Sequence, residues 1–144
     1  MEKNINISGK DVVLHGQVDS IVSTEQVVSI YDYKTKESMS ENEIKGLTKN
    51  SDGNYWRQLV FYKILGNSFG PFAGKDINTS LVFIKPDSKG RCPIVTLSPI
   101  ASDETKLLEE IEVLVKDVVS GEFINKKCDD VECQYCKYKN ILLL

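Results

Sequence analysis

Short runs of β-branched residues, separated by polar turns, predict four strands. Residues 11–21 (DVVLHGQVDSI) and 26–35 (QVVSIYDYKT) lie on either side of a short polar break, which is the pattern of an antiparallel hairpin. A second hairpin is predicted at residues 79–86 (TSLVFIKP) and 92–98 (CPIVTLS), around the turn-forming residues 87–90. Alternation is weak on the first pair of strands, so we expect that sheet to be covered on at least one face.

Two longer segments have helical spacing. In residues 55–65 (YWRQLVFYKIL) apolar positions recur every three or four residues, which predicts a helix capped at Ser51 or Asp52 and ending at residues 66–67. A second helix is predicted from a cap at Ser102 to Gly121. Its apolar stripe consists of Leu107, Leu108, Ile111, Leu114, Val115 and Val118.

The polar residues 37–54 predict a loop with one helical turn near residues 42–46. The elements then follow the order β-β-α-β-β-α, which is typical of an α/β fold. A chain of 144 residues has the usual length of one domain with a core of its own. We therefore expect residues 1–144 to form a single domain.

The composition, 41% hydrophobic and 27% charged, is that of an ordinary globular protein. A formal net charge of −3 argues against nucleic-acid binding by bulk positive charge, although a local basic patch, a metal ion or a partner domain would still allow it. No apolar run approaches the roughly 20 residues of a membrane span, and MEKNINISGKD at the start lacks the apolar segment of a signal peptide. We expect a cytoplasmic protein with no membrane contact.

Charged side chains interrupt the apolar run of the second predicted strand. Asp32 and Lys34 lie two residues apart and so project from one face, and Asp19 on the neighbouring strand reaches the same end of the sheet. Converging carboxylates that leave positions open for water suit Mg²⁺ or Mn²⁺, and a nearby lysine can stabilise charge that develops on a phosphate. The alternative is a solvated strand face with a surface salt bridge, which contributes little to stability.

Three short motifs follow one another along the chain: Gly16-x-x-Asp19, Asp32-Tyr33-Lys34-Thr35 and Gln58-x-x-x-Tyr62. Together they resemble the RecB-type branch of the PD-(D/E)XK nuclease superfamily. This branch occurs at the C-terminus of UvrD/RecB-like helicases, in AddAB-type helicase-nucleases and in some CRISPR-associated nucleases. The resemblance implies a restriction-endonuclease-like core with a central mixed β-sheet flanked by helices.

The resemblance also implies roles for individual residues. Asp19 and Asp32 would bind the divalent metal together with the backbone carbonyl of Tyr33. The catalytic residues would be Asp19, Asp32, Lys34, Gln58 and Tyr62. Without the other motifs, Gln58 would be interpreted as a helix-surface residue and Tyr62 as a core residue, although residues four apart do share one helix face.

Two features depart from the family pattern. Family members usually carry a helix before the first strand, with a histidine that adds a metal ligand, whereas this sequence begins close to that strand. His15 lies inside the strand, and we interpret it as packed or hydrogen-bonded rather than as a ligand. We therefore expect the nuclease core of a longer helicase-nuclease polypeptide.

The cysteines match the family's iron–sulfur pattern only in part. Cys133-x-x-Cys136 corresponds to one pair of ligands, but the later and the upstream cysteines are missing, so we do not expect a cluster. Cys128 adds a third thiol and Cys92 lies in a predicted strand. A zinc site with three cysteines remains an alternative, and we favour reduced or packed thiols.

The function expected from these patterns is that of a metal-dependent deoxyribonuclease, the nuclease module of a helicase-nuclease in DNA repair or recombination. Its partners would be DNA, single-stranded, and helicase domains of the same polypeptide or complex. We place Thr35, Trp56 and Arg57 along the DNA path, because aromatic and guanidinium groups stack on unpaired bases. A core position for Trp56 is an equal alternative. A non-catalytic DNA- or protein-binding module and a stand-alone restriction-type endonuclease are the competing functions.

Overall fold

The central sheet has four strands and is mixed. The computed structural model describes residues 1–126, 132–134 and 136–138. The strands, in their order across the sheet, are β3 (Ser20–Ser23), β4 (Val27–Lys34), β5 (Asp76–Phe83) and β6 (Ile94–Leu97). The β3–β4 and β5–β6 pairs are antiparallel, while β4 and β5 run parallel, so the predicted α/β architecture is confirmed.

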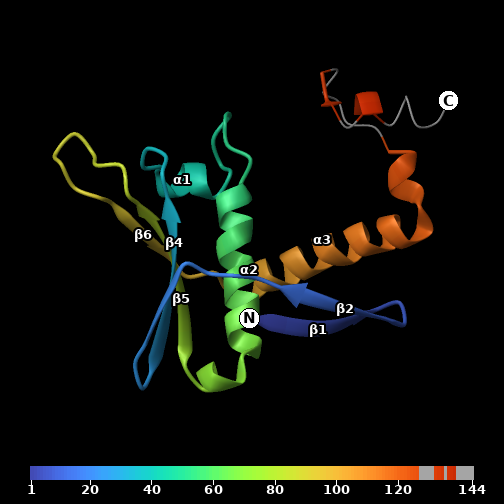
Figure 1. Ribbon diagram of the computed structural model, residues 1–144, viewed down its shortest axis with the longest axis horizontal. Helices are drawn as coiled ribbons and strands as arrows, with labels where there is room; N and C mark the ends of the chain where they lie inside the picture. Colours follow the sequence, from blue (N-terminus) through green and yellow to red (C-terminus); the bar gives the residue numbers. More distant parts are fainter. Residues whose placement is uncertain (127–131, 135, 139–144) are drawn as a thin grey trace. The chain divides into compact units, whose positions relative to one another are not determined.

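A parallel pair of strands requires a long crossover, and helix α2 (Asn54–Ser68) supplies it. Figure 1 shows α2 running along one face of the sheet between β4 and β5 in the chain. On β4, Val28, Ile30 and Asp32 are buried, whereas Tyr33 is exposed. The face predicted to carry Asp32 is therefore the face that α2 covers.

Two apolar clusters join the helices to the sheet. The first consists of Val28, Ile30, Tyr62, Phe72 and Ile77, and the second of Ile44, Leu59, Leu81, Phe83 and Leu97. Helix α2 and strand β5 contribute to both clusters, whereas β4 contributes only to the first. Burial of these side chains at about 25 cal/mol per Å² holds α2 in one position on the sheet.

Most predicted elements occur where the sequence placed them. The order β3, β4, α2, β5, β6, α3 (Ala101–Ser120) reproduces the predicted β-β-α-β-β-α order. The short helix α1 (Glu41–Ile44) lies at the predicted helical turn, where Ser40 and Glu43 form a capping box. Two 3₁₀ turns, η1 (Gly70–Phe72) and η2 (Glu122–Ile124), complete the described elements.

The prediction of one strand over residues 11–21 was wrong. The segment forms β2 (Lys10–His15) and β3, separated by an irregular stretch at residues 16–19. A further strand, β1 (Glu2–Ile7), pairs with β2 in a hairpin that the sequence analysis missed. Its two-residue turn has positive φ at both Ser8 and Gly9, as tight hairpins prefer, so the Ser-Gly dipeptide was the available signal.

The helix boundaries also differ from the predictions. The N-cap of α2 is Gly53, in a left-handed conformation, while Asp52 accepts a hydrogen bond from the Asn54 backbone N–H. Helix α2 continues to Ser68, beyond the end predicted at residues 66–67. Helix α3 begins at Ala101, before the predicted cap, and the Asp103 carboxylate accepts from the Ile100 N–H.

The described chain divides into two compact units, Met1–Leu108 and Glu109–Leu144. The first unit contains every residue that the sequence analysis assigned to the active site. Along the predicted α3 stripe, Leu107 is buried, while Leu114 and Val118 are exposed. No helix in the described ranges is long and apolar enough to cross a membrane.

Close contact between α2 and the sheet yields a stability prediction at Gly66. A Cβ there would lie 3.1 Å from Ile77 Cγ2 and 3.3 Å from Ile30 Cδ1, so Gly66→Val should overpack the core and lower the free energy of unfolding by about 1–3 kcal/mol. Gly70→Val is the matched control, because no atom lies within 4 Å of the added Cβ. Denaturant unfolding should show a change within about 0.5 kcal/mol for this control. Equal losses in both variants would contradict the close packing of α2.

Candidate active site

A closed polar network lies where β4 meets α2. Asp32 is only 6% exposed, and its Oδ1 atom accepts hydrogen bonds from Tyr62 Oη at 2.9 Å and Gln58 Nε2 at 3.0 Å. Its Oδ2 atom lies 2.5 Å from Lys34 Nζ. Strand β4 supplies the ion pair, because side chains two residues apart, such as Asp32 and Lys34, project from the same face. Helix α2 supplies both hydrogen-bond donors, because Gln58 and Tyr62 are four residues apart and share a helix face.

Gln58 links every member of this network. Its Oε1 accepts from Lys34 Nζ at 2.7 Å, and its Nε2 donates to Asp32 Oδ1 and to Tyr62 Oη, the latter at 2.8 Å. One amide therefore orients the ammonium, the carboxylate and the phenol together. A glutamine is suited to this position, because its amide oxygen accepts and its amide nitrogen donates hydrogen bonds without adding charge.

The Tyr62 hydroxyl is held in its protonated form. Burial is the largest cause that raises its pKa, to about 12, and the hydrogen bond and charge of Asp32 raise it further. The Gln58 amide acts in the opposite direction, and the charge of Asp19 adds a small increase. At neutral pH the hydroxyl thus remains a donor to Asp32.

Tyr55 is a member of the site that the sequence analysis did not assign. The Lys34 ammonium lies 4.6 Å from the centre of the Tyr55 ring, within the range of a cation–π interaction. Tyr55 precedes Gln58 by three residues, so the two share a face of α2. This spacing was the sequence signal that could have assigned Tyr55 to the site. Its contact with Lys34 also depends on where α2 crosses the sheet.

Asp19 reaches the same end of β4 from the stretch between β2 and β3. Its Oδ2 accepts a hydrogen bond from the Tyr33 backbone N–H at 2.8 Å. In the β3–β4 ladder Ser20 pairs with Tyr31, so Asp19 stands opposite Asp32 at the next position outward. Unlike Asp32, Asp19 is exposed.

Gly16 allows the chain leading to Asp19 to lie against α2. A Cβ at Gly16 would lie 2.6 Å from Leu65 Cδ1 and 3.3 Å from Phe61 Cε1. Leu65 is fully buried, so it has little room to move aside. Close packing therefore explains why the first motif has a glycine. Gly16 lets the chain between β2 and β3 pass directly against α2.

The donor atoms suit a divalent metal ion. In the described part of the chain, Asp32 Oδ2 is the one buried side-chain oxygen or nitrogen without a hydrogen bond, and its neighbour is the Lys34 ammonium at 2.5 Å. A buried carboxylate, with a second carboxylate at the same strand end, offers the hard oxygen ligands that Mg²⁺ and Mn²⁺ prefer. Within residues 1–126, 132–134 and 136–138 no three His, Cys, Asp or Glu side chains form a metal-binding group. An ion held by two carboxylates would keep much of its water.

The residues expected along the DNA path lie around this centre. Thr35 is exposed immediately after β4. Arg57 is exposed and donates to the Asp52 carbonyl at 3.0 Å. Trp56 is half-buried against the second apolar cluster, with Lys45 Nζ 5.3 Å from the centre of its ring. The Trp56 side chain is thus partly packed in the core, which was the alternative interpretation for this residue.

The remaining candidates are one histidine and four cysteines. His15 is exposed at the end of β2, where it pairs across the hairpin with Glu2, so the expectation of a packed histidine was wrong. Cys92 is exposed, and Cys133 and Cys136 are half-buried. Cys128 lies outside the described residues.

The sequence profile of the PD-(D/E)XK nuclease superfamily matches residues 1–141. The chain belongs to this superfamily, whose members are generally nucleases that act on DNA and typically use divalent metals such as Mg²⁺. Comparison with curated proteins and with solved structures gave no significant match.

The raised pKa of Tyr62 predicts a loss of stability in alkali. The folded protein holds this proton more tightly than the unfolded chain, whose tyrosine pKa is about 10. The stabilisation that this tightly held proton gives the folded protein is therefore fully present below about pH 10. It is lost as the pH rises toward the folded pKa of about 12. Between these values the free energy of unfolding, measured with denaturant in metal-free buffer, should fall more steeply for the wild type than for Tyr62→Phe. Parallel curves for the two proteins would contradict this environment for Tyr62.

Proposed function

We propose that this chain is a RecB-type nuclease module that hydrolyses DNA phosphodiester bonds with the help of a divalent metal ion. The observation that carries the proposal is the state of Asp32. Its Oδ2 atom is buried and unbonded except for the Lys34 ammonium at 2.5 Å, while its Oδ1 atom is held by two donors from α2. A buried polar atom without a hydrogen bond is rare in folded proteins, and a bound ion is one of the usual reasons for it.

Asp32, Asp19 and the Tyr33 carbonyl are the groups that would hold Mg²⁺ or Mn²⁺. When bound, the ion supplies Lewis-acid chemistry: it neutralises phosphate charge and acidifies a water molecule. The Asp19 carboxylate is already directed to this strand end by its hydrogen bond from the Tyr33 N–H. The assignment of these ligands rests on the donor set and on the family motifs.

Lys34 is the group of the chain itself that would stabilise charge at the phosphate. Its ammonium has three fixed neighbours, the Asp32 carboxylate, the Gln58 carbonyl oxygen and the Tyr55 ring. A donor that is oriented before the reaction needs no reorganisation when negative charge develops on the phosphate oxygens. Gln58 and Tyr62 act through Asp32 and Lys34, because they hold the two charges in place.

The combination of Gln58 and Tyr62 with the Asp32–Lys34 pair supports the RecB-type branch within the superfamily. We extend the proposal accordingly to a module of a UvrD/RecB-like helicase-nuclease in DNA repair or recombination, working on single-stranded DNA beside helicase domains. Thr35, Trp56 and Arg57 would lie along the path of the strand. In this proposal residues 1–144 serve as one nuclease domain.

The decisive experiment for this proposal removes the lysine. Lys34→Ala should lower the rate of Mg²⁺- or Mn²⁺-dependent cleavage of single-stranded DNA by at least about 10²-fold, because one oriented donor contributes about that factor. Lys34→Gln keeps a hydrogen-bond donor beside Asp32 and should lose activity similarly, which separates charge from folding. Lys85→Ala is the matched control, since Lys85 pairs with Glu37 at the surface.

Circular dichroism should show that the variants remain folded, and Asp19→Ala should abolish cleavage and so exclude a contaminating nuclease. A Lys34→Ala protein that cuts at the wild-type rate, in preparations where Asp19→Ala does not cut, would contradict the catalytic role of Lys34. A wild type that binds DNA without cutting it in either metal would instead favour a binding module.

A further inference from the structure

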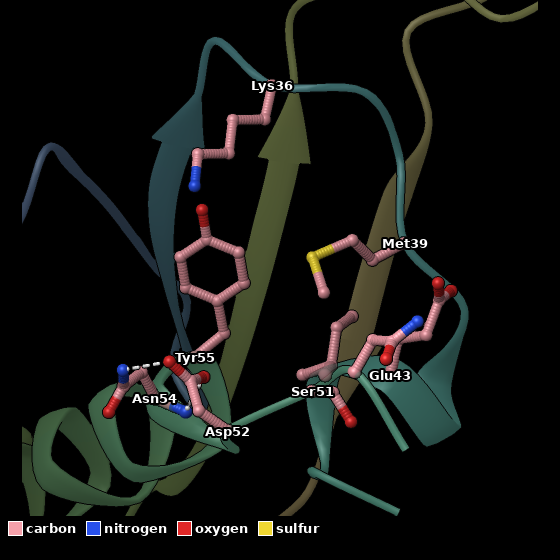
Figure 2. Close-up of a pocket in the computed structure, with 9 residues that line it drawn as sticks. Lys36, Met39, Glu43, Ser51, Asp52, Asn54 and Tyr55 are labelled. Atoms are coloured by element: carbon pink, nitrogen blue, oxygen red, sulfur yellow. Dashed lines mark hydrogen bonds between the residues drawn. The ribbon is translucent and has the colours of Figure 1, made fainter. Parts of the chain in front are cut away.

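A pocket of about 250 Å³ lies next to the network described above. Figure 2 shows the Tyr55 ring and the Met39 side chain facing this space from opposite sides, with Lys36 at the end nearest the tip of β4. Glu43 and Asp52 also line the pocket, Glu43 on the side of Met39 and Asp52 on the side of Asn54. The pocket is formed by the segment that follows β4, by α1 and by the first turn of α2.

Tyr55 connects the pocket with the proposed catalytic lysine. Its ring lines the pocket and also lies 4.6 Å from Lys34 Nζ. A group in the pocket would therefore be about one side chain away from a phosphate at Lys34.

Close backbone packing fixes the chain segments next to the pocket. A Cβ on Gly46 would lie 2.8 Å from the Gly53 backbone nitrogen, so the end of α1 and the start of α2 are in direct backbone contact. Both glycines have positive φ, 73° and 67°, a conformation that other residues rarely adopt. The pocket is thus held open by the fold.

The chemistry of the lining favours a small neutral ring. The volume lies below the roughly 300–1,000 Å³ of sites for drug-sized ligands, so the occupant is small. Two carboxylates, Glu43 and Asp52, outnumber the one ammonium of Lys36, which disfavours a phosphate inside. The Tyr55 ring and the Met39 thioether offer apolar surfaces of the kind that accept an aromatic ring.

A polar group at the rim is available to recognise the edge of such a ring. Asn50 lines the pocket and is exposed, and its side-chain amide forms no hydrogen bond with any residue that the structure describes. An amide of this kind offers both a donor and an acceptor, as the edges of nucleobases require.

We infer that this pocket binds one unpaired nucleobase of the strand whose phosphate lies at Lys34. The inference rests on the proposed function and adds to it a substrate requirement, because a base paired in a duplex could not enter the pocket. Stacking on Tyr55 and contact with Met39 would anchor the strand, and any base has a face that can stack in this way.

The test compares two DNA strands of equal charge. One is a fluorescently labelled single-stranded oligodeoxynucleotide, and the other has every base replaced by an abasic unit. Binding is measured by fluorescence anisotropy in EDTA, so that no strand is cut. Met39→Ala should weaken binding of the base-containing strand by about tenfold, and Asn50→Ala by about threefold, while neither changes the affinity for the abasic strand.

Leu47→Ala is the matched control, because Leu47 is 70% exposed on the same connecting segment and does not line the pocket. It should leave both affinities unchanged. Met39 packs against the second apolar cluster, whereas Asn50 is exposed, so the Asn50 variant tests the pocket without disturbing the core.

Equal wild-type affinity for the two strands, or an equal loss on both strands in the pocket variants, would overturn the inference. If cleavage still depends on Lys34 in that case, the proposed function stands and only the base pocket is refuted. If cleavage proceeds without Lys34, the proposed function is refuted independently of these affinities.

Discussion

The ion pair between Asp32 and Lys34 is the interaction around which the described site is organised. Both side chains project from one face of β4 and are largely covered, with exposed fractions of 8% and 16%. Taking two charges out of water is costly. The pair is tolerated because Gln58, Tyr62 and Tyr55, all on α2, surround it with hydrogen bonds and an aromatic face. The position of α2 on the sheet is consequently a condition for the site.

Glycines at three points make that position possible. Gly66 lets α2 approach Ile30 and Ile77, and Gly16 lets the chain before β3 pass against Leu65 on the same helix. Gly53 starts α2 in a left-handed conformation directly against Gly46. Close packing and charge placement are therefore linked: a helix held farther from β4 would leave Asp32 and Lys34 without their partners. The contact between Gly46 and Gly53 lies next in the chain to the pocket-lining residues Asp52 and Asn54.

Local pattern was sufficient to predict the features that depend on one segment. The β-branched run before Asp32 predicted β4, its alternation put Asp32 and Lys34 on the face of Val28 and Ile30, and helical spacing put Gln58 and Tyr62 together. The β1–β2 hairpin was missed because β1 contains two asparagines, which are depleted in strands, and because strand formation there depends on pairing and on the Ser8–Gly9 turn. Tyr55 was missed because its contact with Lys34 is set by how a helix crosses a strand twenty residues earlier in the chain, which no local pattern encodes.

The proposed metal site requires that the buried Asp32 carboxylate bind a divalent cation. Calorimetric titration of Mn²⁺ into the wild type and into Asp32→Asn tests it most directly, because the substitution keeps the size and an oxygen of the side chain while removing its charge. Glu25→Ala is a suitable control, since Glu25 is an exposed carboxylate in the β3–β4 turn. The account predicts weak, saturable binding by the wild type and the control, and none by a folded Asp32→Asn protein. Equal Mn²⁺ binding by the wild type and by Asp32→Asn would contradict it.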